Sequence, residues 1–208
     1  TSRIFDFDRI PYFVLTDPAY AQRYARMFTR NAALTAQEWL AAFAARGKQA
    51  VFMAERRAEG FHDISIPAGG ILGLCAWRTR LAEAYRTGEV ARIGASWQQG
   101  VAPRQHLADW HADKLAQLDG AARFVSGIEN THQPTYLSEK LFDAFACGAR
   151  PLYLAEGSHR IHGLDLPQGA WVNLAGMDAA QAVGAIDAAP WDEGFYAAYA
   201  DAQSRLAT

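Results

Sequence analysis

The chain has 208 residues, of which half are hydrophobic and a fifth are charged, and its formal net charge is −2 at pH 7. This composition predicts a folded globular protein rather than a disordered one, and the length fits one large domain or one domain with part of another. Without an overall positive field we expect no nucleic-acid partner. No apolar run approaches the roughly 18 residues that a transmembrane helix needs, although peripheral contact with a membrane stays open.

The two cysteines, Cys75 and Cys147, are far apart and neither belongs to a Cys-x-x-Cys pair. Their spacing therefore predicts two free buried thiols and neither a disulfide framework nor a zinc site. No charged and then apolar leader opens the chain, so we expect a cytoplasmic protein.

Two helix starts are marked in the first 47 residues. Asp17 followed by Pro18 is typical of an N-cap with proline in the first helical position. Thr35 and Glu38 have the spacing of a capping box, and the helix that they open is expected to end at Gly47.

From residue 50 onward, short apolar runs alternate with stretches of helical periodicity. This alternation predicts an α/β fold with a Rossmann-like parallel sheet and flanking helices. Strands are predicted at residues 50–54, 90–94, 123–128, 151–154 and 171–174. Helices are predicted at residues 77–86, 106–118, 139–147, 178–187 and 192–206, and residues 55–73 are predicted to form a long loop.

A polar loop follows the predicted strand 123–128 and leads into the helix 139–147. In an open parallel sheet, ligands bind beyond the carboxyl ends of the strands, where helix N-termini present free N–H groups. The predicted donor-binding residues in this position are Glu129, Asn130, Tyr136, Ser138, Glu139 and Lys140.

These residue types suit a nucleoside diphosphate. Lys140 supplies positive charge for phosphate, and Glu139 can accept hydrogen bonds from paired ribose hydroxyls. Asn130 and Tyr136 provide neutral hydrogen-bonding groups for a sugar.

Histidines do not indicate a metal site. His106 and His111 are five residues apart and do not share a helix face, while His159 and His162 lie in a loop without a further ligand pattern. We therefore expect no metal ion and no other cofactor.

The polar loop and its surroundings resemble the signature of the α1,3-fucosyltransferases, which reads approximately F-x-x-x-F-E-N-S, then Y-x-T-E-K, then G-x-x-P. The matching positions are Phe124-x-x-x-Ile128-Glu129-Asn130, then Tyr136-Leu137-Ser138-Glu139-Lys140-Leu141, then Gly148-x-x-Pro151. The resemblance covers about thirty-five residues, with the spacing within each block preserved.

Outside this block the similarity is weaker. Arg78 and Arg80 are similar to the family's R-x-R/K helix, whose first arginine contacts the donor pyrophosphate, and the resemblance assigns that role to Arg78. Two positions depart from the family pattern. Ala91 stands where an aspartate is usual, and Glu55-Arg56 replaces a Ser-Asn pair.

The resemblance implies the donor half of a two-domain GT-B-type glycosyltransferase. Residues 1–47 would be the end of the acceptor-side domain or a helical lead-in, residues 48–190 the nucleotide-sugar-binding domain and residues 191–208 a C-terminal helix. The implied enzyme transfers L-fucose from GDP-fucose with inversion to a hydroxyl of a saccharide or lipid-linked glycan. Arg78 and Lys140 would stabilise the departing diphosphate. The family's general base lies in the upstream half, so none is assigned here.

Two alternatives stay open. Because the two departures lie where the base or the sugar could be recognised, an enzyme of the same fold could use another nucleotide sugar. The chain could also be a nucleotide-binding module without catalytic activity.

Overall fold

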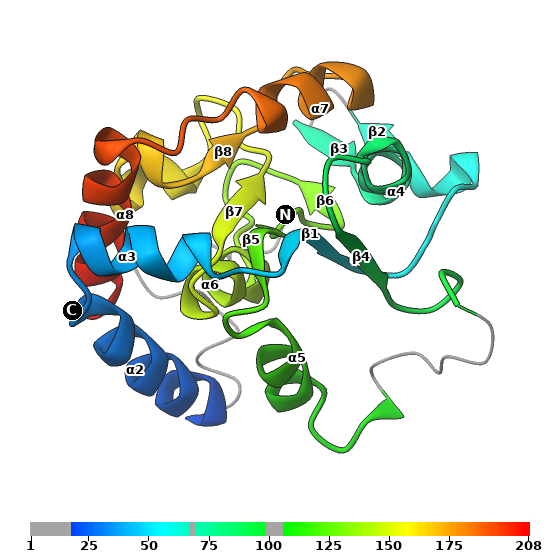
Figure 1. The fold of residues 1–208 in the computed structure, drawn as a ribbon. Helices are drawn as coiled ribbons and strands as arrows, with labels where there is room; N and C mark the ends of the chain where they lie inside the picture. The colour runs from blue at the N-terminus through cyan, green and yellow to red at the C-terminus, as the bar shows by residue number, and fades with distance from the viewer. Residues whose placement is uncertain (1–17, 67–69, 99–105) are drawn as a thin grey trace.

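The computed structural model describes residues 18–66, 70–98 and 106–208. Within these residues, five strands form one parallel sheet in the order β4-β1-β5-β7-β8 (Figure 1). The strands are β1 (Lys48–Met53), β4 (Val90–Ile93), β5 (Ala122–Ser126), β7 (Arg150–Tyr153) and β8 (Val172–Asn173). The prediction of an α/β fold with a Rossmann-like parallel sheet is confirmed.

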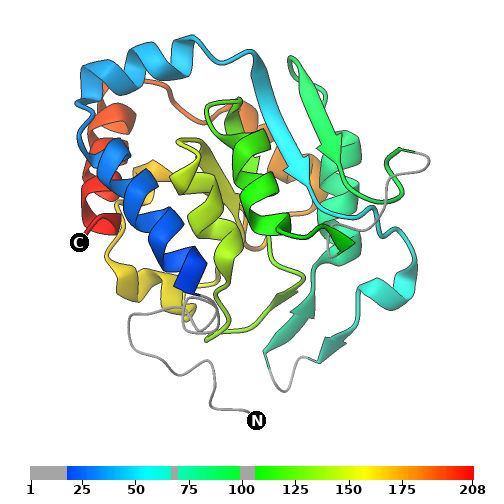
Figure 2. The same ribbon diagram turned by 90° about the horizontal axis from the view of Figure 1, so that it is seen from below.

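Helices cover both faces of this sheet (Figures 1 and 2). The side chains of Ala50 and Phe52 on β1 belong to a core with α4 and α7, whereas Val51 and Met53 belong to a core with α5 and α6. Alternating strand residues point to opposite faces, so this division follows directly from the apolar run of β1. The helices are α4 (Cys75–Ala84), α5 (Trp110–Leu118), α6 (Glu139–Ala146) and α7 (Ala179–Asp187).

A third core joins both ends of the described chain to α6. Helices α2 (Pro18–Ala32), α3 (Ala36–Ala44) and α8 (Glu193–Leu206) pack there through large aromatic side chains, including Trp39, Phe43 and Tyr199. The Tyr199 hydroxyl donates a 2.8 Å hydrogen bond to the carbonyl of Ala149, which ties α8 to the end of α6. The proposed division of the chain near residues 47 and 190 stays a prediction.

Local capping signals account for several helix ends. The capping box of Thr35 and Glu38 is present at the start of α3. Gly148 adopts the left-handed conformation, with φ +72°, shortly after α6 and before β7, where a glycine commonly ends a helix. The predicted N-cap Asp17 lies outside the described residues.

Three predictions about element bounds are wrong by three residues or more, while the other predicted bounds lie within two residues of the structure. The helix predicted to end at Gly47 ends at Ala44, where Ala45 forms the C-cap without a left-handed residue. The helix predicted from residue 106 begins at Trp110, because the Asp109 carboxylate accepts a hydrogen bond from the Ala112 amide and caps the helix there.

The third correction concerns residues 55–73, which contain more than a loop. The segment includes a 3-10 turn, η2 (Gly60–His62), and a hairpin of β2 (Ser65–Ile66) and β3 (Ile71–Gly73). Strand β3 also pairs with β6 (Thr131–His132), so a small antiparallel sheet lies beside the carboxyl ends of the main strands. Two further 3-10 turns, η5 (Arg160–Leu164) and η6 (Gln168–Ala170), connect β7 to β8.

The order of the strands reverses between β1 and β5. The chain passes from β1 to β4 on one side, and then returns to place β5 on the other side of β1. At such a switch point the connections leave the sheet in opposite directions, which opens a crevice beyond the carboxyl ends of the two strands. The fold therefore favours a ligand site next to residues 53–55 and 127–130.

Replacing Phe142 with alanine is expected to destabilise the fold. Phe142 is 7% exposed in the core shared by α2 and α6, so Phe142→Ala should lower the free energy of unfolding by about 3–5 kcal/mol. Urea unfolding followed by circular dichroism measures the change. Phe61→Ala is the control, because Phe61 is 67% exposed and its loss should change stability by less than about 0.5 kcal/mol. Equal effects of the two changes would contradict the assignment of this core.

Candidate functional site

A cavity of about 350 Å³ lies at the switch point. It receives residues from the end of β1, from the loop after β5 and from the first turns of α4, α5 and α6, which is the position expected for a ligand site in this fold. The lining residues are Met53, Ala54, Glu55, Arg57, Arg78, Gly94, Trp110, Lys114, Asn130, Glu139 and Lys140.

Two glycines permit the close backbone approaches around this cavity. Gly94 has φ +138°, and a Cβ atom there would lie 2.6 Å from the carbonyl oxygen of Ala54. A Cβ atom on Gly127 would lie 3.0 Å from the carbonyl oxygen of Lys140. Strands β4 and β5 can therefore end in direct contact with the segments that line the site.

Glu129 connects the end of β5 to the start of α6. Its side chain is buried, and its carboxylate accepts hydrogen bonds from the Ser138 amide at 2.8 Å and from the Ser138 hydroxyl at 2.7 Å. The Lys140 ammonium lies 3.1 Å from the same carboxylate. Glu129 and Ser138 thus lie behind the cavity wall and hold the first turn of α6 in place.

Glu139 and Lys140 form the part of α6 that faces the cavity. Their charged groups are 3.1 Å apart, and both side chains remain partly accessible. Burial disfavours the charged form of Lys140, but Glu129 and Glu139 outweigh it and raise the pKa of the ammonium above its ordinary value. Burial likewise opposes ionisation of Glu139, yet Lys140 and Lys114 lower the pKa of its carboxyl. The Lys140 charge is consequently shared with two carboxylates.

Arg78 lines the same cavity, but none of the described carboxylates lies within ion-pair distance of its guanidinium. Its side chain is buried, and its Nη1 donates hydrogen bonds to Asn130 Oδ1 at 2.7 Å and to the Ile128 carbonyl at 3.4 Å, both neutral acceptors. Its Nε has no hydrogen-bond partner among the described residues. Burial lowers the pKa of the Arg78 guanidinium from its ordinary value, although arginine stays charged at neutral pH.

The other lining cations each have a carboxylate within ion-pair distance. Arg57 lies 2.7 Å from Glu55, Lys114 lies 2.7 Å from Asp143, and Lys140 is paired as described above. Within the described parts of the chain, no carboxylate forms an ion pair with Arg78, although Glu129 and Glu55 favour its charged form from farther away.

The structure thus brings four predicted residues to one cavity, namely Arg78, Asn130, Glu139 and Lys140. Tyr136 is not among the lining residues, and its backbone carbonyl accepts a 2.8 Å hydrogen bond from His159 Nε2. Burial lowers the pKa of His159 to about 4, so this ring is neutral at pH 7.

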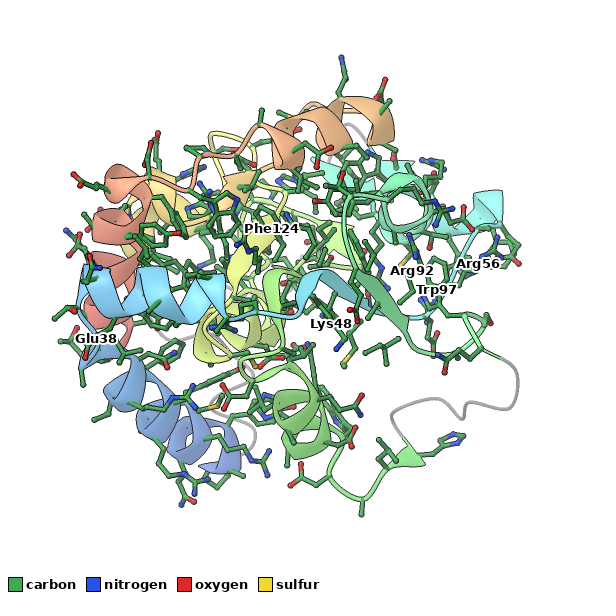
Figure 3. The ribbon with its side chains drawn as sticks, viewed as in Figure 1. Glu38, Lys48, Arg56, Arg92, Trp97 and Phe124 are labelled. Atoms are coloured by element: carbon green, nitrogen blue, oxygen red, sulfur yellow. The ribbon has the colours of Figure 1, made fainter. Side chains whose placement is uncertain are left out.

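Glu55, Arg57 and Lys114 also line the cavity, although their sequence context does not predict a site there. Glu55 belongs to the Glu-Arg pair that departs from the family pattern. Its neighbour Arg56 lies near Trp97 at the outer side of the sheet (Figure 3) and pairs with Glu83. Alternate residues after β1 thus take different directions, and Glu55 and Arg57 line the cavity.

Lys114 belongs to a buried network between α2, α5 and α6. Asp143 accepts hydrogen bonds from the Tyr24 hydroxyl at 2.6 Å and from His111 Nε2 at 2.8 Å, in addition to its ion pair with Lys114. Arg23 can only donate to His111 Nδ1, which lies 3.0 Å away. The ring nitrogen Nε2 then carries a proton and donates it to Asp143.

Other features of the described residues bear on the predicted partners. Cys75 and Cys147 are free and buried. Among the residues outside the undescribed segments, no group of three or more His, Cys, Asp or Glu side chains could hold a metal ion. No helix in the described ranges is both long and apolar enough to cross a membrane.

Comparison with known proteins adds no assignment, because no protein-family model and no curated protein matches this chain.

The Asp143 network is expected to make stability depend on pH. Burial opposes ionisation of Asp143, but Lys114 and His111 outweigh it and hold the pKa at about 2, below the value of roughly 3.9 in an unfolded chain. The resulting stability is present above pH 4 and is lost as the pH falls toward 2, on the order of 2 kcal/mol in total. The difference in the free energy of unfolding between the parent chain and Asp143→Asn, measured with urea, should therefore decrease from pH 5 to pH 2. A difference that stays constant over this range would contradict the network.

Proposed function

We propose that the chain binds the diphosphate of a nucleotide sugar in the cavity at the switch point, as part of a glycosyltransferase. The observation that carries this proposal is Arg78, a buried guanidinium whose hydrogen-bond partners among the described residues are all neutral. A buried charge without a counter-ion is costly, and an anionic ligand at this position would offset that cost. Planar guanidinium groups also suit phosphate oxygens particularly well.

The arrangement of neighbouring groups supports the same function. Asn130 holds one end of the guanidinium, while Nε and Nη2 make no hydrogen bond to a described residue. The first turn of α6 lies beside the cavity, where its free N–H groups add partial positive charge. A diphosphate bound here would leave its sugar near Glu139.

The reaction that we propose is transfer of L-fucose from GDP-fucose to a saccharide or lipid-linked glycan with inversion. The acceptor oxygen forms a bond to the anomeric carbon, the bond from that carbon to the phosphate oxygen breaks, and GDP leaves with the electron pair. A base takes the acceptor proton, and Arg78 stabilises the charge that develops on the leaving diphosphate. This choice of donor rests on the resemblance in residues 124–151.

One observation favours a different donor as the second candidate. Glu55, which replaces a family serine, lines the cavity and pairs with Arg57 at 2.7 Å. A carboxylate in this wall changes which hydrogen-bond donors of a base or sugar can be accepted.

Calorimetric titration with GDP, UDP, CMP and TDP distinguishes GDP-fucose from another nucleotide sugar as the donor. We expect GDP to bind at least tenfold more tightly than the other three. Preference for UDP or TDP would replace the fucosyl donor with another nucleotide sugar. Absence of binding by all four nucleotides would contradict the proposed function.

Replacing Arg78 tests the site itself. Arg78→Met should weaken GDP binding by more than tenfold, since charge-assisted hydrogen bonds to the diphosphate are lost. The stability of the ligand-free chain should stay equal or rise, because the variant removes a buried charge that has no counter-ion.

Arg80→Met is the matched control on the same helix. Arg80 is half-exposed and pairs with Asp63 at 2.8 Å, outside the cavity lining, so its loss should leave GDP binding unchanged. If Arg78→Met binds GDP as tightly as the parent chain, the assignment of the site is wrong.

A further inference from the structure

Lys114 reaches the cavity from the side opposite to Arg78. Arg78 lies on α4 and Lys114 on α5, and these helices cover opposite faces of the sheet (Figures 1 and 2). Both side chains line the cavity at the switch point. A ligand bound between them would therefore meet one cation from each face.

A diphosphate carries more negative charge than Arg78 alone can offset. Lys140 shares its charge with two carboxylates, Glu129 and Glu139, each 3.1 Å away. Among the described residues, Lys114 has one carboxylate within ion-pair distance, Asp143, and it acts on Glu139 from farther away. Fewer carboxylates thus offset the charge of Lys114 than that of Lys140, and Lys114 should attract a further anion more strongly.

Asp143 does not depend on Lys114 as its sole partner. Its Oδ1 atom accepts hydrogen bonds from Tyr24 and His111, whereas Lys114 contacts Oδ2. If the ammonium turns toward a ligand, the carboxylate keeps two donors. Asp143 can thus hold Lys114 in place before binding without preventing its movement.

We propose that Lys114 is a second diphosphate-binding cation, positioned by Asp143 and directed at the phosphate groups from the side opposite to Arg78. This inference rests on the proposed function. It adds to that site a residue that lies outside the segment of family resemblance. Arg78 of α4 would contact the diphosphate from one side and Lys114 of α5 from the other.

A double-variant cycle distinguishes ligand contact from a purely structural role. GDP binding is measured by calorimetry for the parent chain, Lys114→Met, Asp143→Asn and the double variant. Lys114→Met should weaken GDP binding about tenfold, the loss expected for one charge-assisted hydrogen bond. Asp143→Asn should weaken GDP binding less than Lys114→Met does, because Lys114 keeps its charge and loses only the carboxylate that positions it.

The double variant gives the decisive result. It leaves no buried carboxylate without a cation, so it is expected to fold even if Lys114→Met does not, and urea unfolding of each protein checks this. We expect the double variant to bind GDP about tenfold more weakly than the parent chain. Affinity restored to the parent value would show that Lys114 serves only as the counter-ion of Asp143, and would overturn the inference while leaving the proposed function intact. A parent chain that binds no GDP would overturn both.

Discussion

The site depends on one constraint, the burial of a positive charge with which no carboxylate of the described residues forms an ion pair. Arg78 is placed at the switch point by α4 and is held there by Asn130 Oδ1 at 2.7 Å. Around it, the other lining cations are paired with Glu55, Asp143 or the two carboxylates that contact Lys140. Paired cations contribute little net field, so the attraction for an anion is concentrated at Arg78.

The remaining polar groups keep this arrangement in position. Glu129 joins the end of β5 to the first turn of α6 through the amide and hydroxyl of Ser138. Asp143 joins α6 to α5 through Lys114 and His111, and to α2 through Tyr24. Two buried carboxylates therefore fix α6 to its neighbours, one on each side of the residues that face the cavity. Preorganisation of this kind reduces the ordering that a ligand must bring about when it binds.

Features set by local chemistry could be predicted from the sequence. The parallel strands follow from short apolar runs between helical stretches, and the start of α3 follows from the capping box at Thr35. The cluster at residues 129–140 could be placed at a site because it lies between a predicted strand and a predicted helix. Each of these signals is contained within a few neighbouring residues.

Features that depend on distant pairing could not be predicted. Strands β2, β3 and β6 are two or three residues long and exist because they pair with one another, so their own sequences show no clear period. Lys114 lies on a helix whose pattern indicates only an apolar face, and its role becomes visible when Asp143 is placed opposite to it. Arg57 is brought to the cavity by the path of the chain after β1. In the absence of any matching family or curated protein, these contacts come from the structure alone.

A crystal structure of the chain with GDP tests the central claim most directly. We predict that diphosphate oxygens lie within hydrogen-bond distance of the Arg78 guanidinium, in the cavity between α4, α5 and α6. The result that would contradict this account is GDP bound elsewhere, for example in the groove between α2 and α5 that is lined by Arg23, Arg26 and Arg30, with the Arg78 cavity holding no part of the nucleotide.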